Sequence, residues 1–173
     1  MNLNGTVTME LIGQAHILSP RAAIQYGYLS RAPGLDTLFI GTPENESTAI
    51  FTFYNDTTTA RIINNGSLRI TNREGTAMFY FNPSAGATFT NSASFQTGTP
   101  IMIASLTHQV ILDTVHNSFI TQFSLTITSV SDFVLNGQTQ RIGAPGQKMT
   151  WLVYGRPKTG GSTFDIAGFA LSH

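Results

Sequence analysis

The chain of 173 residues contains no cysteine. Disulfide bonds, thiolate nucleophiles and cysteine-ligated metal sites are therefore excluded. No segment approaches the roughly 18 consecutive apolar residues that a membrane-spanning helix needs. The first residues, MNLNGTVTMELIG, have neither the basic stretch nor the apolar stretch of a signal peptide. We therefore expect a protein with no membrane span and no leader in the given sequence.

Charge is also scarce. Charged residues make up 10% of the chain, against roughly 25% in an average soluble protein. Nine basic and nine acidic residues cancel, and no run of basic residues could follow a phosphate backbone, so nucleic acid is not an expected partner. A surface made of Thr, Ser, Asn, Gln and Gly is common in extracellular domains and coat proteins. The composition favours a secreted or extracytoplasmic location.

Helix signals are nearly absent, and strand signals run along most of the chain. The strands alternate with Gly, Asn and Pro clusters that supply turn geometry, and Asn65-Gly66 is the clearest hairpin signal. The sequence predicts one all-β, antiparallel domain over residues 1–173, either a β-barrel of about eight strands or a jelly roll, since both limit exposed edges. The segments rich in β-branched and aromatic residues are 6–13, 47–56, 58–64, 67–72, 75–82, 101–113, 118–130, 150–155 and 163–172.

Residues 13–46 fit this pattern less well, because they contain three prolines and only short apolar pieces. We interpret them as an irregular insertion with one or two short strands that covers one end of the barrel.

Side-chain alternation divides the strands into two kinds. In 101–113, Met102, Leu106 and His108 share an apolar face while the other face is polar, which is typical of a half-buried strand. The segments 49–54 and 77–81 are instead apolar on both faces. Such strands lie either between two layers or between a pocket and an interface.

The segment LTHQVILDTVHN, residues 106–117, contains two histidines and an aspartate that invite a metal or acid-base interpretation. Alternation places His108 and Asp113 on opposite faces, and His116 lies roughly 26 Å further along a straight strand. Hairpin decoration is therefore favoured over a His/Asp metal site, and no metal or other cofactor is expected. His108 on a core face is either a structural group or, in a ligand-lined barrel, an acid-base group that titrates near neutral pH.

Four charged residues, Arg61, Arg69, Arg73 and Glu74, surround the Asn65-Gly66 turn. They could form an anion pocket if their strands pair, but a solvated edge with weak surface ion pairs is the favoured interpretation. The sequence contains neither a G-x-S-x-G elbow nor the spacing of a phosphate-binding glycine loop. A serine hydrolase and a nucleotide-binding protein are therefore not expected.

Two segments carry a family resemblance. REGTAMFYFNP, a Gly-initiated strand that ends in an Asn-Pro turn, and the terminal GGSTFDIAGFALSH resemble strands of the dirigent and allene oxide cyclase-like barrels. In that family the turn is acidic-Pro, where this chain has Asn82-Pro83. The resemblance covers about 25 residues and implies an eight-stranded barrel that binds a small apolar molecule and shapes its coupling or cyclisation. No counterpart of the family's polar functional residues is found.

The leading hypothesis is a barrel that binds a small apolar or aromatic ligand in its cavity. Tyr54, Tyr80, His108 and Trp151 are the predicted lining residues. Catalysis is not expected beyond a cofactor-independent, cyclase- or isomerase-like templating of a reactive ligand. The alternative is a self-assembling structural protein, such as a jelly-roll virus coat protein, whose composition is similar. In either case a homo-oligomer is expected.

Overall fold

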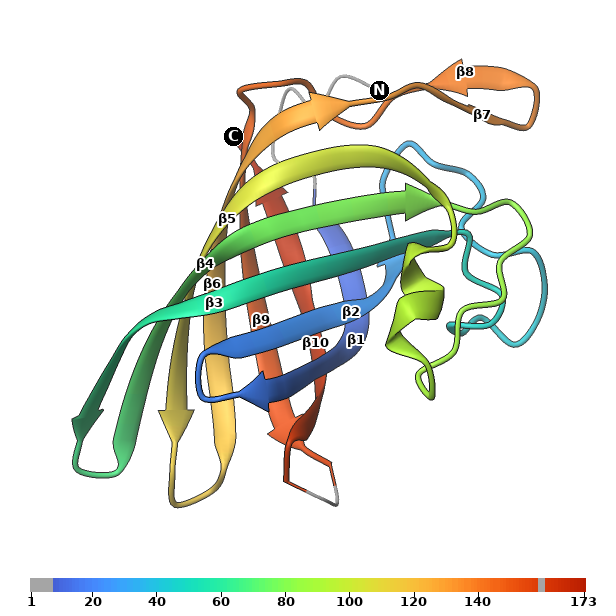
Figure 1. Ribbon diagram of the computed structural model, residues 1–173. Coiled ribbons are helices and arrows are strands. Elements are labelled where there is room, and N and C mark those ends of the chain that lie inside the picture. Colours follow the sequence, from blue (N-terminus) through green and yellow to red (C-terminus); the bar gives the residue numbers. More distant parts are fainter. Residues whose placement is uncertain (1–7, 159–160) are drawn as a thin grey trace.

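A computed structural model describes residues 8–158 and 161–173. Eight antiparallel strands form a closed barrel in the order β1-β10-β9-β6-β5-β4-β3-β2 (Figure 1). Strands that are neighbours in the barrel are also neighbours along the chain, apart from the closure of β1 on β10 and a small hairpin inserted between β6 and β9. The barrel strands are β1 (Thr8–Ser19), β2 (Ala22–Arg31), β3 (Phe51–Asn65), β4 (Leu68–Phe81), β5 (Thr99–Asp113), β6 (Ser118–Val130), β9 (Lys148–Pro157) and β10 (Thr163–Ser172).

This order is that of an up-and-down barrel, which confirms the predicted all-β, antiparallel barrel of about eight strands. A jelly roll would need Greek-key connections between strands that are distant in the chain, and the described strands make none. The hairpin predicted at Asn65-Gly66 joins β3 to β4, with Gly66 at φ 61°. The inserted hairpin of β7 (Phe133–Leu135) and β8 (Gln138–Gln140) turns at Asn136 and Gly137, both at positive φ.

The two ends of the barrel differ. The hairpins β1–β2, β3–β4, β5–β6 and β9–β10 surround the same end of the barrel. The β3–β4 and β5–β6 turns are at the bottom of Figure 1, and the β1–β2 turn lies higher in that view. The longer connections, residues 32–50, 82–98 and 131–147, lie at the opposite end, as does the C-terminus. Buried residues of these connections join the barrel's core and close this end; among them are Leu35, Phe133, Leu135 and Ile142.

The interpretation of residues 13–46 as an irregular insertion is wrong for its first half. β1 and β2 are regular strands of ten or more residues that pair along most of their length, with Gly13 directly opposite Gly27. A Cβ on Gly27 would lie 2.1 Å from the carbonyl oxygen of Ile12, so glycine is needed where the two strands approach closely. The irregular part is residues 32–50, which connect β2 to β3 at the closed end.

Large aromatic side chains fill the half of the barrel next to the closed end. Trp151 lies at the centre of this cluster, with its ring 5.4 to 5.7 Å from the rings of Phe53, Phe79 and Phe123. Phe51 and Phe81 extend the cluster towards Phe133 of the inserted hairpin. Rings at these separations and mostly edge-to-face angles are typical of a close-packed interior.

The beginning of β3, one of the two segments that are apolar on both faces, lies between two layers, which is one of the two arrangements expected for it. Outside β2 and β3, the connection 82–98 forms a second, smaller core. It contains the 3-10 helix η1 (Ser92–Gln96), whose Phe95 is fully buried 5.2 Å from the ring of Tyr26. The hydroxyl of Thr52 on β3 donates a hydrogen bond of 2.7 Å to the carbonyl oxygen of Phe95. Within the described residues no helix is long and apolar enough to cross a membrane.

Candidate functional site

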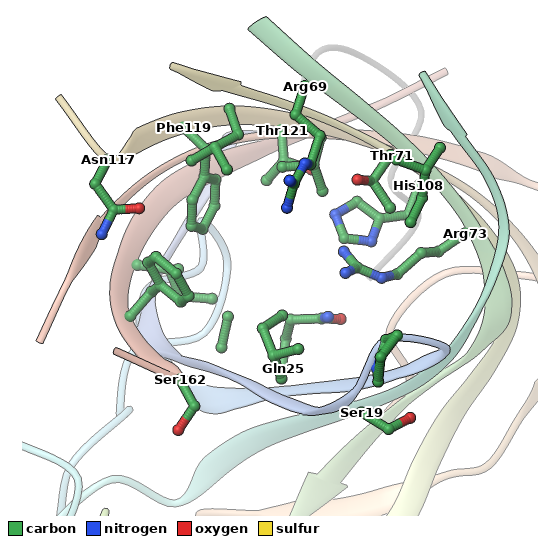
Figure 2. A pocket seen from close by; sticks show the side chains of 18 of the residues that line it. Ser19, Gln25, Arg69, Thr71, Arg73, His108, Asn117, Phe119, Thr121 and Ser162 are labelled. Atoms are coloured by element: carbon green, nitrogen blue, oxygen red, sulfur yellow. The ribbon is translucent and has the colours of Figure 1, made fainter. Parts of the chain in front are cut away.

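The half of the barrel next to the four hairpins is open and contains a cavity of about 550 Å³. This volume lies within the range of roughly 300 to 1,000 Å³ that small-molecule sites occupy. Figure 2 shows this cavity, with side chains converging on it from around the barrel wall. Most of the wall is apolar and comes from β1, β5, β6 and β10; it includes Ala15, Ile17, Val110, Leu112, Phe119, Phe123, Phe164 and Ile166.

A polar group of side chains interrupts this apolar wall. Figure 2 shows Arg73 and His108 beside each other, with Gln25 on the facing side. The sheet register explains this placement, because Arg73 on β4 lies directly opposite His108 on β5 and His108 lies directly opposite Phe123 on β6. Thr71 and Thr121 add two buried hydroxyl groups to the same wall.

His108 is the most unusual group in the cavity. Its side chain is 5% exposed and its ring stacks on that of Phe123, with centroids 4.1 Å apart and planes 6° from parallel. Both ring nitrogens are buried, and neither has a hydrogen-bond partner among the described residues. Burial, and secondarily the positive charge of Arg73, lower the pKa of His108 to about 3. The imidazole is therefore neutral at ordinary pH, with one free donor and one free acceptor.

Arg73 is a half-buried cation, and no carboxylate of the described residues neutralises it. Its Nε donates a hydrogen bond of 3.3 Å to the hydroxyl of Thr59, and it forms no ion pair with any described residue. Burial lowers the pKa of its guanidinium, but an arginine keeps its proton even so. Arg69 lines the same cavity nearer the β3–β4 hairpin. The described lining residues include no Asp or Glu.

Only one of the four predicted lining residues, His108, lines this cavity. Trp151 points into the barrel but lies in its filled half, separated from the cavity by Phe123. Tyr54 and Tyr80 lie on the outer faces of β3 and β4, and Tyr54 packs against the second core with Tyr26. The prediction of their place is therefore corrected. Alternation places Tyr54 on the other face of β3 from Phe53, and Tyr80 on the other face of β4 from Phe79. The two phenylalanines face the interior of the barrel.

The four charged residues around the β3–β4 turn also divide between the two faces. Arg69 and Arg73 line the cavity, whereas Arg61 and Glu74 are exposed outside it. The favoured interpretation of all four as a solvated edge is therefore wrong for Arg73, which is half-buried in the barrel. Arg69 lines the cavity but stays exposed, and its Nε donates a hydrogen bond of 3.1 Å to the Oδ1 of Asn64. Alternation along β4 carried the missing signal, because Arg69 and Arg73 continue the inward positions of Ala77, Phe79 and Phe81. Gln25, Thr71 and Thr121, which the sequence analysis also missed, follow the inward positions of their own strands.

The histidines and the aspartate of residues 106–117 do not come together. Asp113 and His116 form a hydrogen bond at the β5–β6 hairpin, with 2.6 Å between Oδ2 and Nδ1. The backbone N–H groups of Val115 and His116 also donate hydrogen bonds to the Oδ1 of Asp113, as is typical of a tight turn. These contacts, led by the hydrogen bond from His116, lower the pKa of Asp113. His108 lies inside the barrel. In the part of the chain that the structure describes, no three His, Cys, Asp or Glu residues lie close enough to hold a metal ion.

Comparisons with known protein families, with curated proteins and with solved structures find no match. The lining of the cavity combines an apolar wall, a neutral buried imidazole and two guanidinium groups. Because the nitrogens of His108 have no partner, no described Ser or Thr hydroxyl is hydrogen-bonded to it as a nucleophile would be.

Proposed function

We propose that the protein binds a small apolar molecule in the open half of its barrel. The observation that carries this proposal is the contrast between the two halves: aromatic rings fill one, and the other keeps a cavity of about 550 Å³. An eight-stranded barrel is narrow enough for its side chains to fill completely. The small side chains of the open half, such as Ala15 and Thr71, leave room that larger residues would occupy.

Buried polar groups support the same proposal. The Oε1 of Gln25 and both nitrogens of His108 are buried and without partners among the described residues. An unpaired buried polar group costs roughly 1 to 3 kcal/mol, so water or a ligand is expected to pair with groups that line the cavity. The cavity also suits the templating of a cyclisation or coupling, since its walls would hold a reactive ligand in one conformation. The resemblance to the dirigent and allene oxide cyclase-like barrels stays a prediction. It likewise implies a barrel that binds a small apolar molecule and shapes its coupling or cyclisation.

A neutral fluorescent probe tests binding directly. N-phenyl-1-naphthylamine, whose emission rises in apolar surroundings, is expected to bind saturably with one site per chain. Val110→Trp should weaken this binding by roughly tenfold or more, because the indole would occupy volume that the ligand needs. Ile111→Trp is the matched control: Ile111 is the next residue on β5, is 42% exposed and faces outward. Equal binding by the two variants, or no binding by the unaltered protein, would contradict the proposal.

A second candidate function, self-association, is favoured by a different observation. The outer faces of β1, β10, β9 and β6 carry neighbouring apolar side chains, with Ile12 opposite Ala167, Ala167 opposite Tyr154 and Tyr154 opposite Ile120. Tyr154 and Ile120 are 54% and 61% exposed. An apolar area of this kind over four strands is typical of an interface between chains. We name these residues, with Leu152 and Phe169, the outer apolar face. A virus-coat role is less favoured, because the coat proteins compared above are jelly rolls and this chain forms an up-and-down barrel.

Light scattering tests self-association. If the outer apolar face is an interface, the purified protein should have the mass of a dimer or larger assembly, and the double substitution Ile120→Glu with Tyr154→Glu should convert it to a monomer. Burial of two carboxylates in an apolar interface is strongly unfavourable. Gln109→Glu, at an exposed outward position on β5, should leave the mass unchanged. A monomeric unaltered protein at high concentration would exclude this candidate.

A further inference from the structure

We propose that the ligand of the barrel cavity is an apolar organic acid whose ionised group binds Arg73 beside His108. This inference rests on the proposed ligand-binding function and adds the chemical class of the ligand. It follows from the charge of the cavity, in which Arg69 and Arg73 are the only described lining residues that carry a charge at neutral pH.

The position of Arg73 gives the anion its place. The guanidinium is half-buried within the barrel, and Thr59 accepts the one hydrogen bond that its side chain makes to a described residue. A buried cation is stable only when it is paired or hydrogen-bonded. An arginine offers two parallel donors that match the two oxygens of a carboxylate. A neutral ligand that displaced water from this wall would leave these donors and the charge without a partner.

His108 complements this anion. The neutral imidazole can carry its proton on either nitrogen, because no described residue fixes the tautomer. A neutral donor next to Arg73 can bind an oxygen of the acid, while the face of the ring stays against Phe123. The Nε2 of Gln25 makes only a long contact of 3.5 Å to the Thr57 hydroxyl, so this amide is also available from the facing wall. Two or three donors around one oxyanion are enough to orient it.

The rest of the cavity determines the other end of the ligand. Beyond the polar group the wall is made of aliphatic and aromatic side chains, among them Val110, Phe119 and Ile166. Inorganic anions and sugar phosphates would leave this area unused or would desolvate their own hydroxyl groups against it. One acidic group on an apolar body matches both parts of the wall.

Two probes that share one skeleton test the inference. 8-Anilino-1-naphthalenesulfonate is N-phenyl-1-naphthylamine with one added sulfonate group. The sulfonate probe is expected to bind about tenfold or more tightly than the neutral probe, because its charge pairs with Arg73. High salt should reduce the preference only partly, since a buried pair is screened less than a surface pair. Val110→Trp should weaken the binding of both probes, which places them in the cavity.

Arg73→Gln is the decisive variant. It should remove the preference for the sulfonate probe and leave the affinity for the neutral probe nearly unchanged. Arg61→Gln is the matched control, because Arg61 is an exposed arginine of the adjacent strand that does not line the cavity. Equal affinity of the unaltered protein for the two probes would overturn this inference and leave the proposed function intact. Binding of neither probe would overturn both.

A measurement on the unaltered protein covers the case in which Arg73→Gln fails to fold. 1-Naphthoate and 1-naphthalenemethanol differ in carrying a carboxylate or a neutral hydroxyl group on the same ring system. The carboxylate is expected to bind the folded protein more tightly than the alcohol, because its charge pairs with Arg73. It should therefore raise the melting temperature more at equal concentration, since a ligand that binds the folded state more tightly stabilises it more. A larger shift with the alcohol would contradict an acid-binding site.

Discussion

Acidification from pH 7 to pH 4 is expected to cost the folded protein about 3 kcal/mol through His108 alone, by proton linkage. The pKa of His108 is lowered from 6.5 to about 3 by burial and by Arg73. In the unfolded chain the imidazole takes up a proton as the pH falls through 6.5, whereas in the folded protein it does not until about pH 3. The unfolded state therefore binds more protons between these two values. The stability is complete above pH 6.5 and decreases steadily below it.

Urea unfolding at a series of pH values measures this effect. His108→Phe keeps an aromatic ring against Phe123 and has no titrating group, so its stability should fall less between pH 7 and pH 4 than that of the unaltered protein. The difference between the two slopes isolates His108 from the carboxyl groups, which titrate in both proteins. His173→Gln, at an exposed histidine, should retain the full dependence. Identical slopes for His108→Phe and the unaltered protein would contradict the buried, neutral state of His108.

Trp151→Ala is expected to destabilise the protein by about 3 to 5 kcal/mol, the range for loss of a large aromatic side chain from a core. Trp151 is 1% exposed and lies among Phe53, Phe79 and Phe123. The truncation would leave a cavity that these rings cannot fill, since strands of a closed barrel on every side prevent collapse. Its effect on ligand binding should be indirect, through Phe123.

Leu152→Ala is the matched control, because Leu152 is the next residue on β9 and is 37% exposed on the outer face. Its cost should stay within about 1 kcal/mol, as for most surface substitutions. Circular dichroism is the appropriate signal, since Trp151 is the single tryptophan of the chain. A Trp151→Ala protein with normal stability and lost ligand binding would instead support the role of Trp151 as a direct ligand contact.

The two expected effects concern two parts of one interior. In the filled half, Trp151 and its neighbouring rings provide stability. In the open half, Arg73 has no described carboxylate partner and the nitrogens of His108 have no described hydrogen-bond partner, a cost that the filled half offsets. A bound acid would pair with Arg73 and, by its negative charge, raise the pKa of His108. Ligand binding and acid sensitivity should therefore be coupled.

Much of the fold could be predicted from local patterns. β-Branched residues and turn signals located most of the strands, and Asn65-Gly66 identified the β3–β4 hairpin correctly. The first half of β1 falls within the predicted segment 6–13, but the second half of β1 and β2 were missed as regular strands, because Pro20 and the glycines at 13 and 27 are typical of irregular segments. The pairing of β1 with β2 explains these two glycines. Gly13 and Gly27 lie opposite each other where the two strands approach too closely for a Cβ.

Alternation along each strand by itself determined which residues share a face: Phe53 was separated from Tyr54, and His108 was grouped with Leu106 and Val110. It could not determine what covers each face. The tertiary structure decided that connection 82–98 covers Tyr54, that Phe123 separates Trp151 from the cavity, and that Arg69 and Arg73 point into it. The physical reason is that a two-residue period is a local property of one strand, whereas inside and outside exist only once eight strands have closed.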